Sequence, residues 1–328
     1  MANEKNKNIL NNGIESIDFK LALNKDGTLV KNQKNLDGEE RLDVEKLSES
    51  QKFKKFLGNF IVYVLLIALA IAIIFPFYWM INSSLKDLAE YKRSTPTFFP
   101  NVVHLENYLI AFQTADLGKL FVNTLFVGVV STLLSLVVTI LTAFAFARLE
   151  FKGRDLMFGA LLMTMMIPGE LFTITNYETV AVKLQWGNTF AALIIPFLVS
   201  TYYIYLLRQN FKQVPNELYL AAKVDGTSDL KYLIKVMIPL ALPTIITITI
   251  LKMMGSWNSY IWPRLIANDE FHKLITNGLR GTSFTVENET NYPVQMAAVA
   301  IVSAPLFVVF LCFRKYIMRG VSRSGIKG

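Results

Sequence analysis

Two ionisable residues stand inside long apolar runs of this 328-residue sequence, and they are the first candidates for chemistry. Glu170 interrupts the run 156–177, and Lys252 interrupts the run 236–263. A charge in such a run is costly in lipid and usually faces a water-filled cavity or an opposite charge. If both runs are continuous helices that enter from the same side, each charge lies roughly 22–24 Å along its helix, at ~1.5 Å per residue. We therefore expect an ion pair between them or a cavity that both line. The alternative is that each side chain snorkels separately to the outer interface.

Other reactive groups are sparse. The chain has one cysteine, Cys312, in an apolar run, and two histidines, His104 and His272, far apart in polar segments. This inventory argues against a His/Cys metal site, a Cys–His nucleophile and an internal disulfide. No G-x-x-x-x-G-K-[ST] motif occurs, so we expect no ATP hydrolysis by a phosphate-binding loop. A membrane enzyme would need several convergent acid–base residues in the apolar runs, where only the two charges above occur.

The elements that must position these residues are membrane helices. The chain is 53% hydrophobic, with a mean hydropathy of +0.39, which is more apolar than a typical soluble domain. A bilayer-spanning helix needs ~20 mostly apolar residues. Six runs qualify, at about residues 56–85, 120–147, 156–177, 184–207, 236–263 and 292–313. The predicted fold is an all-α membrane protein with six transmembrane helices.

Charge orients these spans. Residues 1–50 are rich in Asn, Lys, Asp and Glu with few aromatics, which predicts a disordered or loosely helical N-terminal extension before a membrane domain at residues 51–328. No apolar run precedes about residue 56, so no signal peptide is expected. Basic residues cluster before the first span, between the second and third, and after the last: Lys52, Lys54, Lys55, Arg148, Lys152, Arg154, Arg314, Lys315, Arg319, Arg323 and Lys327. By the positive-inside rule both termini are cytosolic, and the net charge of +8 reflects these loops rather than a nucleic-acid partner.

The cytosolic stretch 214–239 predicts two short helices joined by a hinge. Pro215 and Asn216 are start signals, and Gly226 is a stop signal. Thr227 or Ser228 can cap the second helix, with Asp229 at its positive end. The second helix has an apolar stripe at helical spacing: Leu230, Leu233, Ile234, Met237 and Ile238. The small side chains of Ala221 and Ala222 let another backbone approach, which favours a loop that sits in a groove on a partner protein.

This stretch resembles the EAA…G…LP cytosolic loop of ABC importer permeases. Ala221, Ala222, Asp225, Gly226 and Pro239 match the motif, whereas its glutamate is Leu220 here and Glu217 lies one turn earlier. The stretch Gly255-Ser-Trp-Asn-Ser-Tyr-Ile-Trp-Pro263 is similar to the G-x-W-N-x-x-x-W-P signature of the carbohydrate-uptake branch. Further similar stretches are 121–125, 143–149, 206–211 and 315–328. The resemblance covers about residues 55–328 and is nearest to the second permease subunit of maltose-type importers.

The resemblance implies a type I importer permease with a cytosolic coupling helix. A sugar or oligosaccharide would cross the plasma membrane of a prokaryote through this chain and a second permease subunit. Two separate ATPase subunits would carry ATP and Mg²⁺, so no cofactor is expected in this chain, and an extracytoplasmic solute-binding protein would deliver the substrate. The residues implied in ATPase coupling are Glu217, Ala221, Ala222, Asp225, Gly226 and Pro239.

The translocation-path candidates combine the two intramembrane charges with an aromatic cluster: Glu170, Lys252, Trp257, Asn258, Tyr260 and Trp262. Pyranose rings stack their apolar faces on aromatic side chains, and their hydroxyls need amide and hydroxyl partners. The alternative for this cluster is an interfacial aromatic belt. The outer loops 86–119 and 264–291 either meet the binding protein or simply connect spans. A neutral sugar is preferred, because basic residues are not concentrated in the spans; the alternatives are a permease for a polyol-like solute such as glycerol phosphate, and a non-transporting scaffold or sensor.

Overall fold

The structure is a computed structural model that describes residues 22–23, 29–34, 40–45, 49–279, 284–286 and 289–322. The chain divides into two compact units, Met1–Pro76 and Phe77–Gly328. In the first unit, strands β1 (Ala22–Leu23), β2 (Leu29–Lys34) and β3 (Glu40–Glu45) pair antiparallel in that order. These strands lie within the extension that the sequence analysis predicts to be disordered or loosely helical. Helix α2 begins at Glu49 and continues to Ser84. The boundary of the extension at residue 50 stays a prediction.

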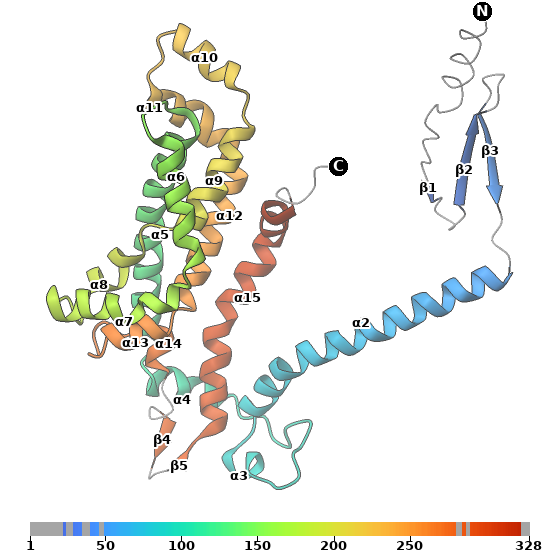
Figure 1. The fold of residues 1–328 in the computed structure, drawn as a ribbon. Coiled ribbons are helices and arrows are strands. Elements are labelled where there is room, and N and C mark those ends of the chain that lie inside the picture. The colour runs from blue at the N-terminus through green and yellow to red at the C-terminus, as the bar shows by residue number, and fades with distance from the viewer. Residues whose placement is uncertain are drawn as a thin grey trace, which may run out of the picture. The chain divides into compact units, whose positions relative to one another are not determined.

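The second unit is a helical bundle with short helices at both ends (Figure 1). Its helices are α3 (Leu88–Tyr91), α4 (Glu106–Thr114), α5 (Leu117–Arg148), α6 (Arg154–Met163), α7 (Phe172–Tyr177), α8 (Phe190–Ile194), α9 (Thr201–Gln213), α10 (Asn216–Val224), α11 (Asp229–Tyr232), α12 (Ile238–Trp257), α13 (Ile261–Ile266), α14 (Ile275–Gly278) and α15 (Tyr292–Ser322). Strands β4 (Thr285–Val286) and β5 (Glu289–Thr290) form a small hairpin. Below, the end of the bundle that carries α10 is the α10 end, and the opposite end, where α5 follows α4, is the α4 end.

Helix α5 is the centre of the bundle and packs against α9 and α12. Its buried face carries small hydroxyl residues, namely Ser131, Thr132, Ser135 and Thr139. Without a hydrophobic driving force in lipid, helices associate through such small residues because their backbones can approach closely. Gly128 marks the tightest approach: a Cβ there would lie 2.8 Å from the Met253 sulfur of α12. Larger side chains on this face would push α12 away from α5.

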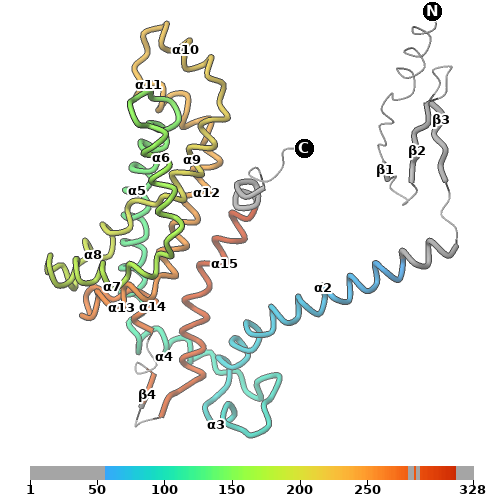
Figure 2. The backbone as a smooth tube through the Cα atoms, viewed as in Figure 1, coloured from blue at the N-terminus to red at the C-terminus, as the bar shows by residue number. Residues whose placement is uncertain are grey.

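The six predicted spans are confirmed in number only when two broken helices are counted. Four helices are long and apolar enough to span a bilayer among the described residues: Phe56–Ser84, Leu117–Arg148, Asp229–Trp257 and Tyr292–Arg314. The third predicted span is bent by 81° between Arg154–Met166 and Gly169–Lys183, and the fourth by 46° between Phe190–Phe197 and Thr201–Gln213. Figure 2 shows both bends. Pro168 lies in the first break, where proline cannot donate the helical hydrogen bond and clashes with the preceding turn. Pro196 lies two residues before the second break, inside the short 3-10 helix Ile195–Phe197.

Two sequence-based expectations are therefore wrong in detail, and a third feature differs from a regular helix. The common depth of the two intramembrane charges assumed continuous helices, and the helix that carries Glu170 is broken just before it. The fifth span ends at Trp257, and the residues after it form a separate helix, α13. The apolar stripe after Gly226 is only half buried, because a π-helical turn at Leu233–Met237 shifts the helical phase. It buries Tyr232, Leu233 and Met237 and leaves Leu230 and Ile234 exposed.

Candidate functional site

The loop that joins α9 to the fifth span is a rigid helical bend. Helix α10 begins after Pro215 and ends in a residue with left-handed backbone, Gly226, at φ +69°. The Thr227 amide donates to the Ala222 carbonyl at 2.8 Å, and the Gly226 amide donates to the Lys223 carbonyl at 3.0 Å. These two bonds are the Schellman arrangement, which satisfies the last carbonyls of a helix. The stop predicted at Gly226 is therefore confirmed, whereas Ser228, at the start of α11, makes no side-chain capping bond.

Side chains also fasten α10 to α11. The Tyr219 hydroxyl donates to Asp229 Oδ1 at 2.7 Å, and Lys223 Nζ lies 2.7 Å from the same oxygen. The hydrogen bond to Asp229 raises the pKa of Lys223, and burial, followed by the bond to Asp229, raises the pKa of Tyr219. The Tyr219 ring also packs on Tyr232, with centroids 5.1 Å apart. We call this bend, residues Asn216–Tyr232, the coupling element.

The outward side of the coupling element carries exposed apolar side chains among charged ones. No residue of α10 is buried, and Leu220 and Val224, one turn apart, are 55% and 88% exposed. Glu217, Ala221 and Asp225 are also exposed, while Ala222 is half-buried against the bundle. Pro239 is not part of this element, because it lies in the first turn of α12. The element thus brings together five of the six residues predicted for coupling.

Arg148 connects the coupling element to the central helix α5, a role that the sequence analysis missed. The side chain is 9% exposed and its Nη2 donates to the Phe211 carbonyl at 2.7 Å and the Val214 carbonyl at 2.5 Å. Its Nη1 donates to Asn216 Oδ1, in the first turn of α10, at 3.3 Å. One guanidinium therefore fixes the end of α9 and the start of α10 to the end of α5. In the sequence, Arg148 stands at the end of an apolar run, and this position indicates only a cytosolic positive charge.

One cavity in the bundle, called the first cavity below, surrounds Lys252. It measures about 340 Å³ and is lined by Val127, Ser131, Leu193, Phe197, Val199, Ser200, Tyr203, Lys252, Gly255, Ser256, Ser259, Trp262, Pro263 and Leu274. Lys252 is half-buried, and its ammonium donates to the Phe197 carbonyl at 2.7 Å. That carbonyl lies at the break of the fourth span, where helical hydrogen bonding stops.

The second cavity, of about 550 Å³, borders the first and contains Glu170. Its walls also include Gly169, Thr173, Asn176, Asn258 and Tyr260, and it shares Phe197, Ser259 and Trp262 with the first cavity. Across the described part of the chain, no ion pair joins Glu170 to Lys252. The expected pair is therefore not formed in this conformation, and the two charges do not line one common cavity either: Lys252 lines the first cavity and Glu170 the second.

The aromatic cluster divides between packing and cavity walls. Trp257 is buried on α15, with its Nε1 donating to the Val302 carbonyl at 3.3 Å and its ring 5.5 Å from that of Phe121. It lines neither cavity, so its predicted place on the path is not supported. Trp262 borders both cavities, and its Nε1 donates to the Ala192 carbonyl at 2.9 Å.

Asn258 and Tyr260 are exposed in the second cavity. Asn258 Nδ2 donates to the Met254 carbonyl at 3.0 Å, and the Tyr260 hydroxyl accepts from Arg264 at 2.6 Å. Both therefore present polar groups to the cavity that contains Glu170.

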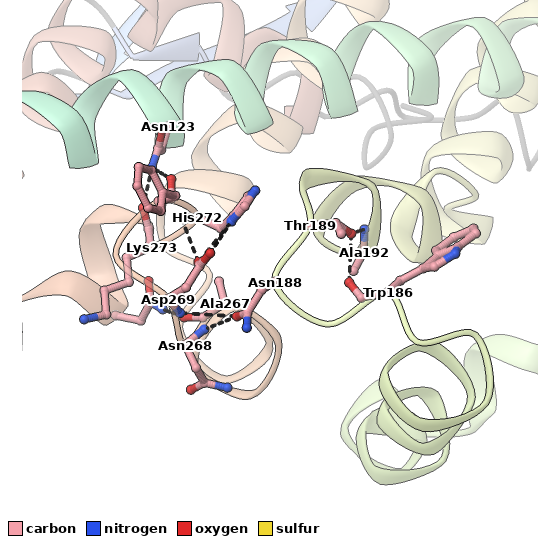
Figure 3. A network of polar contacts seen from close by, with 12 residues as sticks. Asn123, Trp186, Asn188, Thr189, Ala192, Ala267, Asn268, Asp269, His272 and Lys273 are labelled. Atoms are coloured by element: carbon pink, nitrogen blue, oxygen red, sulfur yellow. Dashed lines mark hydrogen bonds and ion pairs between the residues drawn. The ribbon is translucent and has the colours of Figure 1, made fainter.

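Polar side chains connect the loop before α8, the segment after α13 and helix α5 (Figure 3). Asn188, which has a left-handed backbone at φ 56°, accepts from the amides of Asn268 and Asp269 at 2.7 and 3.2 Å. Asp269 in turn lies 2.8 Å from His272 Nδ1. Asn123 of α5 donates to the Phe271 and Lys273 carbonyls at 2.7 and 3.0 Å. The segment after α13 is thus fixed to α5 and to the loop before α8.

The described residues hold no group of three or more His, Cys, Asp or Glu side chains that could bind a metal ion. Cys312 is an exposed thiol. The chemistry that the site offers is therefore binding through hydroxyls, amides, aromatic faces and two isolated charges.

Comparison with known proteins places this arrangement in a family. Residues 135–323 match the profile described as binding-protein-dependent transport system inner membrane component. The chain is 30% identical over 265 residues to the arabinooligosaccharides transport system permease protein AraQ of Halalkalibacterium halodurans, covering 79% of this chain and 93% of that protein. It is 27% identical over 267 residues to the sn-glycerol-3-phosphate transport system permease protein UgpE of Escherichia coli, covering 80% and 94%.

A solved structure has a similar fold. A chain of a bacterial ABC transporter involved in the import of the acidic polysaccharide alginate superposes with a TM-score of 0.72 at 22% identity, covering 83% of this chain and 99% of that one. At this identity the likeness shows the fold alone. The chain belongs to the family of binding-protein-dependent transport system inner membrane components, and it is a permease subunit of an ABC importer.

Proposed function

We propose that this chain, together with a second permease subunit, conducts a sugar or oligosaccharide across the plasma membrane of a prokaryote. In this proposal two ATPase subunits bind at the α10 end, which faces the cytosol with both termini. An extracytoplasmic solute-binding protein delivers substrate to the α4 end. The relative named for arabinooligosaccharide transport matches the chain over most of its length, which supports a carbohydrate.

The observation that carries the proposal is the coupling element. Two conditions favour the docking of a helix on a partner protein: its terminal polar backbone groups are satisfied, and it presents exposed apolar side chains that the partner can cover. The Schellman bonds and the Asp229 contacts supply the first condition. The exposed ridge of Leu220 and Val224 supplies a surface for the second.

Because Leu220 stands where the motif has glutamate, the proposal calls for an apolar contact on the ATPase at this position. Closure of the ATPases would move α10 and, through Arg148, the end of α5 as one body. Alternating access then follows from which conformation each ligand binds better. The two bends in the third and fourth spans lie at the cavities, where broken backbone is tolerated in a membrane because it lines a polar space.

The test is uptake by a strain that lacks this chain, complemented with the wild-type gene and supplied with radiolabelled arabino-oligosaccharides, maltose, or glycerol 3-phosphate. The proposal expects chain-dependent uptake of at least one carbohydrate, abolished when the ATPase subunits are inactivated. Uptake of glycerol 3-phosphate alone would reassign the substrate, and uptake of no solute by any strain would contradict transport.

A further inference from the structure

The cavity around Lys252 contains an uncompensated positive charge. Its walls carry six polar side chains: Ser131, Ser200, Tyr203, Lys252, Ser256 and Ser259. None of its lining residues is acidic, and Glu170 lines only the neighbouring cavity. An ammonium at membrane depth is costly unless an opposite charge or a polar space compensates it.

The hydrogen bonds of Lys252 leave room for a ligand. An ammonium has three N–H donors, and the structure shows one donor used, by the Phe197 carbonyl at 2.7 Å. No described carboxylate forms an ion pair with it. The bond to Phe197 holds the ammonium at the cavity wall while two donors remain.

A second positive element opens onto the same space. The 13-residue helix α9 begins at Thr201, and the cavity is lined by Val199 and Ser200, which precede the helix, and by Tyr203 of its first turn. The first amides of a helix have no backbone partner within the helix, and its dipole favours negative charge there. Here the Tyr203 amide donates to the Ser200 hydroxyl at 3.5 Å. Broken membrane helices present such ends to anionic groups of substrates.

The remaining wall suits a sugar ring. Trp262 is held by its bond to Ala192 and by edge-to-face packing on Phe197, with ring centroids 5.3 Å apart at 83°. Serine and tyrosine hydroxyls surround it. The volume of about 340 Å³ is within the range of small-molecule sites.

From these features we propose that the Lys252 cavity binds the carboxylate of an acidic sugar, of the uronate class, during translocation. A carboxylate carries one negative charge, which one lysine balances, whereas a phosphate monoester carries about −1.5 to −2 at neutral pH. This inference rests on the proposed transport function and narrows its substrate. It replaces the neutral sugar preferred from the sequence, because the fold gathers the lysine and the start of α9 at one place.

The test uses the complete importer, this chain with its permease and ATPase partners, in nanodiscs. Three probes share one ring and differ at C6: glucose, glucuronate and glucose 6-phosphate. Binding is measured by titration calorimetry for wild type, Lys252→Met, Lys252→Arg and the control Lys235→Met, which removes an exposed lysine at the α10 end. A further variant, Ser256→Asp, places a carboxylate one helical turn from Lys252.

We expect wild type to bind glucuronate more tightly than glucose. Lys252→Met weakens glucuronate binding by about 10- to 100-fold, the loss expected for a hydrogen bond to a charged group, and leaves glucose unchanged. Lys252→Arg retains the preference, and Lys235→Met has no effect. Ser256→Asp supplies an internal counter-ion and removes glucuronate binding, so the proposal stays testable if Lys252→Met does not assemble.

Equal affinities for glucose and glucuronate in wild type, or unchanged glucuronate binding in Lys252→Met or Ser256→Asp, would overturn the proposal. Tighter binding of glucose 6-phosphate would overturn the carboxylate assignment. ATP-driven uptake by the same complex in proteoliposomes distinguishes a failure of the proposed carboxylate site from a failure of the proposed transport function. Import of neutral sugars without import of glucuronate by wild type removes the anion site and keeps the importer, whereas import of no carbohydrate removes both.

Discussion

Gly226 offers a substitution whose effect can be worked out from backbone geometry alone. Its φ of +69° lies in the left-handed region, and a Cβ built on it meets nothing within 4 Å. Steric crowding therefore plays no part, and only the conformational cost remains. For a residue with a Cβ that cost is about 1–2 kcal/mol, and β-branched residues resist the region further.

A cost of about 1–2 kcal/mol corresponds to roughly a 5- to 30-fold change in a two-state ratio. We expect Gly226→Ala to lower the population of the bent coupling element by about this factor and Gly226→Val to lower it further. Asparagine tolerates the left-handed cap, so Gly226→Asn keeps most of it. Rates of substrate uptake in cells should follow the order Gly, Asn, Ala, Val, at equal amounts of the chain in the membrane by immunoblot.

The matched control is Gly58→Ala in α2, where a Cβ also meets nothing within 4 Å and the φ is not positive. This variant should transport normally. Wild-type uptake by Gly226→Val, or equal losses in the Asn and Val variants, would refute the reasoning that couples transport to the left-handed cap.

Three further predictions concern other parts of the bundle. Arg148→Met should weaken the attachment of α10 by about 1.5–3 kcal/mol, since the bonds of the Arg148 guanidinium to two carbonyls are charge-assisted. Trypsin should then cleave α10 faster. The control Lys152→Met, at an exposed lysine, should leave the rate of cleavage in α10 unchanged. The hydrogen bond to Glu106 raises the pKa of His104, so this contact stabilises the fold below about pH 6.5, the ordinary value, and is lost as pH rises through the raised pKa. An NMR titration should show a His104 midpoint above that value, and Glu106→Gln should return it. Trp257→Ala should cost about 3–5 kcal/mol and lower the thermal unfolding temperature without changing which sugar is transported; a changed preference would put Trp257 back on the path.

The helical class and the coupling element could be predicted from the sequence because both are local. Long apolar runs determine membrane helices, and the left-handed stop at Gly226 depends on one residue type. Pro168 stands in the break before Glu170, yet the size of the bend, 81°, depends on packing that no run of residues encodes. Where a span is broken, the number of residues from its start no longer gives the depth of a side chain in the membrane.

The site was harder to predict because its geometry is tertiary. Trp257 and Trp262 belong to one sequence signature, but the end of α12 turns the first onto α15 and leaves the second at the cavities. The π-helical turn shifted the stripe after Gly226 by a change in helical phase that apolar spacing does not reveal. Arg148 was visible only as a positive charge, since its partners are backbone carbonyls more than 60 residues away.

The most direct test of the account is cross-linking from α10 in intact cells. The exposed native thiol is first removed by Cys312→Ser. A cysteine is then placed at the exposed Ala221 or, as a control, at Phe271, which is 70% exposed in the segment after α13. The account predicts that Ala221→Cys cross-links to an ATPase subunit and resists a membrane-impermeant thiol reagent, whereas Phe271→Cys reacts with that reagent from outside. Labelling of Ala221→Cys from outside, or an adduct set without any nucleotide-hydrolysing protein, would contradict it.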